Sequence, residues 1–437
     1  MDTAGYRTET PYPARFQKEL NPRRFALALA AQGLAAPDMD APFTYMDLGC
    51  GMGVPLVCLA AGNPHARFYG VDFMAEHVAH ARGLADAAAL NNLDVRAASF
   101  ADLAPGDFPM FDVMVVHGVW SWVTPDVRAQ LLAFIDARLK PGGLLYVSYN
   151  AMPGWAAMIP LREIMKQAFD RAGGDQAARV AAAMAHARAL EGAQTLYLRA
   201  HPTNAIRLKQ MATESPAYLA HEYFNEAWRP CYVREVAADV AGVGLTFAAS
   251  ANLQDNVTDL TVRAEARALF EGATTALERE TLKDMLLCKQ FRRDIFVRGP
   301  SPLSDGEMAA VHARVRFGAL MTPAQLAEAT LTTEIMTVKL NTEVHRGLVG
   351  ALIDAPRTLA EAIRHPAVSG LNANAAFGTF YLLAAMGAVA PAASDAVMAA
   401  ASEPVARLNA EIARRAGTPN AIPARAVAMV GGGVAAN

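Results

Sequence analysis

The sequence predicts an α/β fold in which a parallel sheet is followed by mainly helical segments. Apolar strand-like runs alternate with helical stretches over residues 43–150, and three glycines lie within five positions after the first run. Beyond residue 150 the pattern becomes helical and rich in alanine, arginine and glutamate. Alternating strands and helices are typical of crossover units, which bring their strands into a parallel sheet. A chain of 437 residues is also long enough for two or three domains.

The expected sheet begins with five strands and is completed by two later ones. The first five are expected at about 44–49, 67–72, 93–98, 111–117 and 143–149, with helices between them at 53–62, 74–89 and 126–139. Thr124 and Pro125 suit the N-cap and first position of the last helix. Two further strand-like runs, at 244–253 and 292–299, are expected to pair antiparallel at one edge of the sheet.

Three parts are expected along the chain. Residues 1–150 and 235–300 form the core, residues 151–234 a helical middle or cap region, and residues 301–437 a C-terminal helical or winged-helix-like domain. The final Gly-Gly-Gly-Val-Ala-Ala-Asn is expected to be frayed.

Composition favours a soluble globular protein over other classes. The chain is 53% hydrophobic and 19% charged with a formal net charge of −3, and its basic residues form no block. This charge pattern disfavours a nucleic-acid partner. The sequence has no long uninterrupted apolar window and no secretory signal pattern at its start, so a cytoplasmic protein without a membrane span is expected. The four cysteines lack metal-ligand spacing, so reduced thiols and no metal site are expected: Cys50, Cys58, Cys231 and Cys288.

The glycine-rich turn in "TYMDLGCGMGVP", residues 44–55, predicts a ligand site. Gly49, Gly51 and Gly53 lie where the first expected strand passes into the first helix, and glycine permits positive φ and close approach of a ligand. A phosphate-binding loop is excluded because no Lys-Ser/Thr pair follows the glycines. The G-x-G-x-G spacing also departs from the G-x-G-x-x-G of dinucleotide sites.

Two acids narrow the choice of ligand. Asp47, two residues before the first glycine, would repel a pyrophosphate but would suit an ammonium group. Asp72 ends the second strand about 20 residues beyond the glycines, where an acid can accept the hydroxyls of a ribose. A ligand with a ribose and a cationic end satisfies both.

Three motifs in this order carry a family resemblance. "YMDLGCGMG" at 45–53, "FYGVDF" at 68–73 and "LKPGGLLYVSY" at 139–149 resemble the class I S-adenosylmethionine-dependent methyltransferases. The resemblance implies a seven-stranded Rossmann-like methyltransferase sheet and S-adenosylmethionine as cofactor.

Further motifs resemble bacterial methyltransferases that carry a methyltransferase regulatory domain. They are "PYP" at 11–13, "HGVWSWV" at 117–123, "SYNAMPGW" at 148–155, the stretch 218–247 and "FRRDIFVRG" at 291–299. Characterised members of that group include protein-lysine methyltransferases acting on bacterial outer-membrane proteins. The resemblance therefore implies transfer of a methyl group to a protein lysine amine.

The resemblance also assigns cofactor residues. Asp47 and the three glycines would line the methionine and ribose part, and Asp72 would bind the ribose. Phe73, Ser99 and Phe100 would pack around the adenine, or belong to the core. His117, at the end of the fourth strand, would contact the cofactor and orient or deprotonate the acceptor, or be a structural histidine.

An aromatic wall is expected on the acceptor side. Its members follow the fourth and fifth strands: Trp120, Trp122, Tyr149, Asn150 and Trp155. Such a wall suits an amine or its methylated cation, and the alternative is that these rings wedge the cap onto the core. Tyr6 and Tyr12, on an N-terminal arm, carry the same two interpretations.

The "HEYFNEAW" stretch at 221–228 is not a zinc motif, because Asn225 stands where HExxH needs its second histidine. His221, Glu222 and Trp228 are instead expected at the junction of cap and core, or in contact with the substrate.

The acceptor itself stays open at this point. A protein lysine, a small molecule methylated on nitrogen or oxygen, and a cofactor-binding regulatory protein without turnover all fit these motifs. Neither the oligomeric state nor the group that deprotonates the acceptor follows from the sequence.

Overall fold

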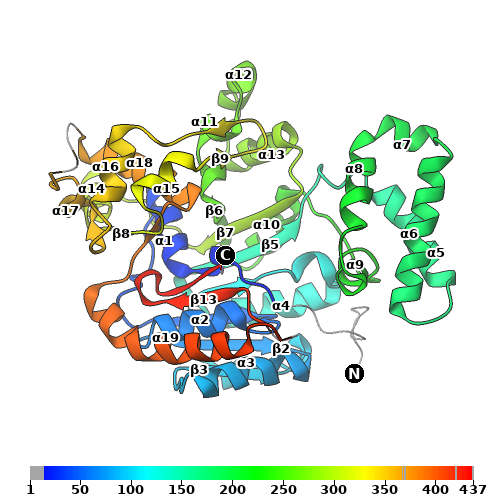
Figure 1. Cartoon of the computed structure of the whole chain (residues 1–437), viewed down its shortest axis with the longest axis horizontal. Helices are drawn as coiled ribbons and strands as arrows, with labels where there is room; N and C mark the ends of the chain where they lie inside the picture. The colour runs from blue at the N-terminus through cyan, green and yellow to red at the C-terminus, as the bar shows by residue number, and fades with distance from the viewer. Residues whose placement is uncertain (1–13, 367, 369–370, 419–420, 436–437) are drawn as a thin grey trace.

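The seven-stranded sheet is the centre of the fold. A computed structural model describes residues 14–366, 368, 371–418 and 421–435. Its strand order is β3-β2-β1-β4-β5-β7-β6, and helices cover both faces (Figure 1). The strands are β1 Thr44–Leu48, β2 Arg67–Asp72, β3 Leu93–Ala97, β4 Phe111–Val116, β5 Leu139–Asn150, β6 Leu245–Ser250 and β7 Phe291–Arg298.

The strand directions confirm the predicted sheet. The first five strands are parallel, and β7 runs antiparallel to both β5 and β6. One detail differs, because β5 begins at Leu139 rather than 143. Leu139 pairs with Phe111 and Leu144 pairs with Val113, so the intervening turn residues 140–143 bulge out of the ladder.

Alternating side chains divide the strands between two hydrophobic clusters. On β5, Leu144 and Tyr146 pack in one cluster, and Leu145 and Val147 pack in the other. Successive residues of a strand face opposite sides, so both faces of this sheet are buried as in other parallel sheets. Helix α1 covers the first face, and α4 and α10 cover the second. The helices around the sheet are α1 Pro22–Ala31, α2 Val54–Gly62, α3 Ala75–Ala87, α4 Pro125–Arg138 and α10 Val233–Ala241.

The middle region forms a helical body beside the sheet, drawn in green in Figure 1. Its helices are α5 Ile159–Arg171, α6 Gln176–Gly192, α7 Leu196–Ala200, α8 Pro202–Met211 and α9 Pro216–Tyr223. They enclose their own hydrophobic cluster, in which the rings of Phe169 and Phe224 stack at 4.6 Å. A separate small core lets this region keep its shape independently of the sheet.

After β6 the chain passes through short helices to β7, and then into the C-terminal part. The elements before β7 are α11 Thr258–Thr261, α12 Arg267–Glu271 and α13 Ala276–Leu287. Those after it are α14 Asp305–Arg314, β8 Arg316–Ala319, α15 Pro323–Glu328, β9 Leu331–Thr332, β10 Thr337–Val338, α16 Glu343–Gly350, β11 Arg357–Thr358, α17 Leu359–Ala362, α18 Ala373–Met386, β12 Val389–Pro391, α19 Asp395–Arg415, β13 Ala424–Val427 and β14 Gly432–Ala435.

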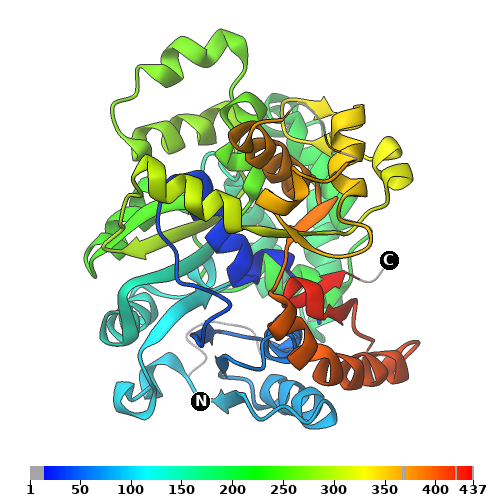
Figure 2. The same ribbon diagram turned by 90° about the vertical axis from the view of Figure 1, so that its left-hand side faces the viewer.

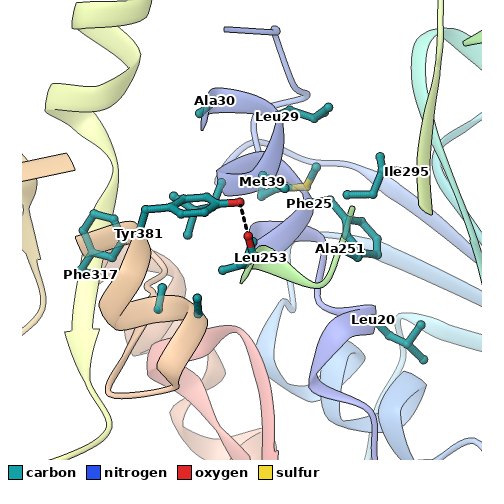
Figure 3. Close-up of a cluster of buried hydrophobic side chains, with 14 of the residues drawn as sticks. Leu20, Phe25, Leu29, Ala30, Met39, Ala251, Leu253, Ile295, Phe317 and Tyr381 are labelled. Carbon is teal, nitrogen blue, oxygen red and sulfur yellow. Dashed lines mark hydrogen bonds between the residues drawn. The ribbon is translucent and has the colours of Figure 1, made fainter. Parts of the chain in front are cut away.

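The C-terminal part shares a hydrophobic core with the sheet domain. Phe317 and Tyr381 belong to the same buried cluster as Phe25 of α1. The Tyr381 hydroxyl donates a hydrogen bond of 3.1 Å to the Leu253 carbonyl (Figure 3). Helix α19 lies alongside α2 and α3 (Figures 1 and 2). The chain therefore returns to the core at its end.

The expectation of a frayed end is wrong for residues 431–435. Strands β13 and β14 form an antiparallel hairpin that packs on the end of α2. The Asn63 side chain donates to the Gly431 carbonyl at 2.8 Å, and the Asn21 side chain donates to the Val430 carbonyl at 2.7 Å. A run of glycines looks mobile in sequence, but here its missing side chains allow close backbone contact.

We expect Gly62→Ala to destabilise the protein by about 1–3 kcal/mol, because a Cβ there would lie 2.5 Å from the Gly432 nitrogen. Alanine at a helix position is otherwise favourable by up to about 1 kcal/mol. Gly83→Ala in α3 is the matched control, since its nearest neighbour, the end of the Arg415 side chain, lies 3.9 Å away. Urea denaturation compares the two, and equal stability of both variants would contradict the packing of the hairpin on α2.

Candidate functional site

A cavity of about 670 Å³ lies at the carboxyl edge of the parallel strands. Ligands of open α/β sheets bind at this edge. All the residues predicted for the cofactor line the cavity: Asp47, Gly49, Gly51, Gly53, Asp72, Phe73, Ser99, Phe100 and His117. The structure therefore brings together residues that are up to 70 positions apart in sequence.

The glycine turn forms the floor of one end. Gly49 has φ +91°, and a Cβ there would lie 2.5 Å from a methyl group of Val119. Gly53 has φ +71° and is the N-cap of α2, where a Cβ would lie 2.5 Å from that of Ala81. Only glycine satisfies both the left-handed backbone and the close packing, and the turn leaves main chain exposed to a ligand.

Asp72 is held at the end of β2 by three donors. Its carboxylate accepts the Gly51 N–H at 2.8 Å and the Met74 N–H at 2.9 Å, and lies 3.1 Å from His77 Nδ1. The first of these bonds ties the acid to the glycine turn. The carboxylate is thus positioned in advance at the place where it can also accept ligand hydroxyls.

Asp47 is a buried acid with an open acceptor. Its side chain is 3% exposed, and its Oδ1 has no hydrogen-bond partner among the described residues. Burial, with a smaller contribution from nearby Asp72, raises its pKa to about 7. An unpaired buried carboxylate is unfavourable until a cation or donor meets it. The site therefore fits a ligand with an ammonium group next to the glycine turn.

His117 ends β4 and is anchored from β5. Its Nδ1 lies 2.9 Å from the Tyr146 hydroxyl and 3.1 Å from the Ser148 hydroxyl. Burial, with the positive charge of Arg293, lowers its pKa to about 4. The ring is therefore neutral near pH 7, and it faces the cavity with a fixed orientation.

The rest of the cavity wall, beyond the predicted cofactor residues, comes from the middle region, from the ends of strands and from the N-terminal segment. The middle region contributes His221 and Glu222 from α9, and Asn225 from just beyond the end of that helix. Trp122 reaches the cavity from a short 3-10 turn after β4, and Asn150 and Phe291 reach it from the ends of β5 and β7. Arg15, Gln17 and Leu20 come from the N-terminal segment. The cavity is thus also lined by residues that lie far in sequence from the glycine turn and Asp72.

Some of these residues were missed by the sequence reasoning. Arg15 and Gln17 belong to none of the motifs found in the sequence, and Phe291 opens the motif at 291–299 without an assigned role. The position of Phe291 follows from its pairing with Asn150 in the β5–β7 ladder. Two strands could be recognised from their patterns, but their register is a tertiary property.

The predicted aromatic wall requires correction, because three of its members do not line the cavity. Trp120 is fully buried beneath the sheet, and Trp155 packs in the middle region, where its Nε1 donates to the Gln290 carbonyl at 2.8 Å. Tyr149 donates to Asp294 Oδ2 at 2.6 Å on the face opposite the cavity. Adjacent strand residues point to opposite faces, so Tyr149 and Asn150 cannot both face one cavity. Tyr6 and Tyr12 lie outside the described residues.

We expect Tyr149→Phe to lower the free energy of unfolding by about 1–3 kcal/mol, because it removes a buried donor to Asp294. Cofactor affinity, measured by titration calorimetry, is expected to stay within twofold of wild type. A large loss of affinity at unchanged stability would instead return Tyr149 to the site.

The described ranges hold neither a metal-binding cluster nor a helix able to span a membrane. Within residues 14–435, apart from the five undescribed positions, no group of three or more His, Cys, Asp or Glu side chains is arranged to hold a metal ion. None of the helices in the described part of the chain combines the length and apolar character that crossing a membrane needs.

The strand order, the glycine turn and the two acids at the carboxyl edge together define a class I methyltransferase. A family model for a methyltransferase domain matches residues 46–145, and one for a predicted methyltransferase regulatory domain matches residues 215–298. The protein sll1526 of Synechocystis sp. is 32% identical over 433 residues, which are 99% of this chain and 85% of that protein. The chain therefore belongs to the S-adenosylmethionine-dependent methyltransferases that carry a methyltransferase regulatory domain.

Solved and curated relatives agree with this assignment. PKMT2 from Rickettsia typhi, in complex with AdoHcy, superposes with a TM-score of 0.65 at 18% identity, covering 87% of this chain and 77% of that one. The likeness shows a common fold. Trans-aconitate 2-methyltransferase from Azoarcus sp. is 35% identical over 114 residues, 26% of this chain and 42% of that protein. The protein is thus an S-adenosylmethionine-dependent methyltransferase, and the predictions of enzyme class and cofactor are confirmed.

Proposed function

We propose that this enzyme transfers methyl groups to the amine of a lysine side chain in a protein. The observation that carries the proposal is the chemistry of the cavity wall beyond the predicted cofactor residues. This wall presents a carboxyl group, an indole and amides, from Glu222, Trp122, Asn150 and Asn225. A carboxylate and an aromatic face are the groups that attract an amine or its methylated cation. The resemblance to lysine methyltransferases of bacterial outer-membrane proteins supports the same acceptor.

We assign the cofactor end of the cavity from the same chemistry. Asp47 would pair with the amino group of the cofactor's methionine part. The glycine turn would contact the amino-acid end of that methionine part. Asp72 would accept the ribose hydroxyls. Phe73 and Phe100 would pack against the adenine, for which Ser99 offers a hydroxyl.

The protein's part in catalysis is alignment rather than covalent chemistry. When bound, S-adenosylmethionine supplies an electrophilic methyl group on a sulfonium sulfur. His117 is neutral and so adds no positive charge beside it, and its anchored ring can orient the acceptor. The segments around Arg15 and α9 would exclude water, and holding the acceptor in line converts an encounter into a near-attack geometry.

The middle region would give access to a large substrate. Since α9 both closes the cavity and belongs to the independent helical cluster of residues 155–224, we infer that residues 151–234 form the acceptor-binding domain. The 1–150 and 235–300 segments would be the catalytic core, and residues 301–437 a supporting domain.

Labelled S-adenosylmethionine tests the acceptor. Incubation with a fractionated bacterial outer-membrane protein extract should label a protein band, and peptide mass spectrometry should place the methyl group on lysine. Labelling confined to small molecules would identify a small-molecule N- or O-methyltransferase and overturn the proposal. Binding without production of S-adenosylhomocysteine would indicate a regulatory binding protein. Asp47→Asn, at a cofactor concentration well below its dissociation constant, serves as the control with reduced labelling.

A further inference from the structure

Five carboxyl groups of the described residues line the cavity, and they differ in their surroundings. Asp47 and Asp72 belong to the cofactor end. Asp102 accepts a hydrogen bond of 2.6 Å from the Ser99 hydroxyl, and Asp126 lies in the exposed first turn of α4. Glu222 is the carboxyl contributed by the middle region.

Glu222 is set among charged groups without being directly paired to them. The Arg15 guanidinium stacks 4.6 Å over the ring of Tyr218 on the same helix, and it also lines the cavity. The Arg207 guanidinium lies 4.2 Å over the ring of Trp155 and bonds to Gln290. Within the described residues, no ion pair or hydrogen bond of the Glu222 carboxyl itself is found.

Glu222 reaches the cavity from another element than the cofactor residues do. His117, Asn150 and Phe291 come from the strand ends, whereas Glu222 approaches from α9. An acceptor bound between the strand ends and α9 would lie within reach of this carboxyl. A carboxylate with open acceptor capacity can take up the N–H groups of an amine.

We propose that Glu222 contacts the acceptor amine and takes its proton before methyl transfer. This inference rests on the proposed function, because it requires an amine as acceptor. A proton moves from the lysine Nζ ammonium to the Glu222 carboxylate, and the freed nitrogen lone pair forms the new N–C bond. The C–S bond breaks with its electron pair going to sulfur, and the carboxyl returns its proton to water.

The electrostatics of the cavity agree with this role. Burial raises the pKa of Glu222 to about 7, outweighing the opposing effect of Arg15 and Arg207, while Glu214 adds a smaller rise. A general base works best with a pKa near the working pH, because it is then partly unprotonated and still basic enough to accept a proton. Two further titratable groups line the same cavity: His221 of α9, and His117, which is neutral near pH 7.

Glu222→Gln tests the proposal, with Glu214→Gln as a control for loss of one negative charge nearby. We expect kcat on the methylated lysine substrate to fall about 100-fold in Glu222→Gln, which is the usual contribution of a general base. The fall of kcat on the acidic side of about pH 7, measured at saturating S-adenosylmethionine so that the ionisation of Asp47 does not contribute, should disappear as well. Affinity for S-adenosylmethionine, measured by calorimetry, should stay within twofold, and Glu222→Asp should recover part of the rate.

The outcomes separate the two proposals. If the wild-type enzyme methylates lysine and Glu222→Gln retains both its kcat and its acidic limb, the role of Glu222 is overturned and the acceptor assignment stands. If wild type labels only an oxygen or carbon acceptor, both proposals fall. A loss of rate of the same size in Glu214→Gln would show a general charge effect and would also overturn the role of Glu222.

Discussion

Replacing Asp47 with asparagine is expected to weaken S-adenosylmethionine binding by about 10- to 100-fold. The buried Oδ1 of Asp47 has no partner in the described structure, and an ammonium group would provide one. A hydrogen bond between charged groups contributes roughly 1.5–3 kcal/mol, which corresponds to this loss. Titration calorimetry of the two proteins at pH 8 measures the difference.

The affinity of wild type should also depend on pH. Because the pKa of Asp47 is raised to about 7, the carboxyl is largely protonated at pH 6 and must release its proton to pair with the cation. Binding should therefore tighten as the pH rises through about 7, and Asp47→Asn should lack this dependence. Asp94→Asn on the exposed part of β3 serves as the control and should behave like wild type.

The same substitution should have the opposite effect on the stability of the cofactor-free protein. A carboxyl whose pKa is raised from 3.8 to about 7 on folding binds more protons in the folded state, so stability falls as the pH rises across that interval. Asp47→Asn removes this cost, which is at most about 4 kcal/mol at pH 8 and small at pH 4. Urea denaturation at both pH values measures it. A variant that is weaker in binding but no more stable at pH 8 would contradict the ionisation argument.

Replacing Arg292 with methionine should have the largest effect on folding. This guanidinium is the centre of a buried cluster on β7, where it bonds to Asp284 Oδ1 at 2.6 Å and to Glu280 Oε2 and Asp294 Oδ2, each at 2.8 Å. Without the cation, three carboxyl groups would be buried together. Removing one partner of a buried ion pair costs about 3–5 kcal/mol, and thermal denaturation should show a large fall in the midpoint.

Two further variants make this test independent of a simple failure to fold. The double variant Arg292→Met with Asp284→Leu removes a carboxyl along with the cation, and it should recover part of the lost stability. Arg414→Met breaks an exposed pair with Glu411 and should leave the midpoint unchanged. If Arg292→Met unfolds at the wild-type midpoint, the cluster does not stabilise the β5–β7 end of the sheet.

The cofactor half of the protein could be predicted from the sequence because its signals are local. Strand and helix periods, the G-x-G-x-G spacing and the acid that follows about 20 residues later all act within a single strand–turn–helix–strand unit. Asp47 and Asp72 reach the cavity because each lies at the carboxyl end of its own strand. Backbone geometry within such a unit leaves few alternatives.

The acceptor half could not be predicted in the same way. Tyr149 and Asn150 are adjacent in one strand-like run, and nothing local distinguishes their positions. The side of the sheet that each residue faces depends on the strand register. Glu222 and Arg15 line the same cavity because the middle region and the N-terminal segment both pack beside it.

The protein as a whole shows the same difference between features set by local sequence and features set by tertiary contacts. Local periodicity and spacing predicted the α/β core, its antiparallel edge pair and a ligand with a ribose and a cationic end. The resemblance of the motifs to a known family identified that ligand as S-adenosylmethionine. No local pattern predicts that the glycines at 431–433 pack on α2. No local pattern predicts which residues line the cavity beside Glu222 either. Those features arise from contacts between segments far apart in the chain, which depend on how the helical regions dock onto the sheet rather than on any short pattern.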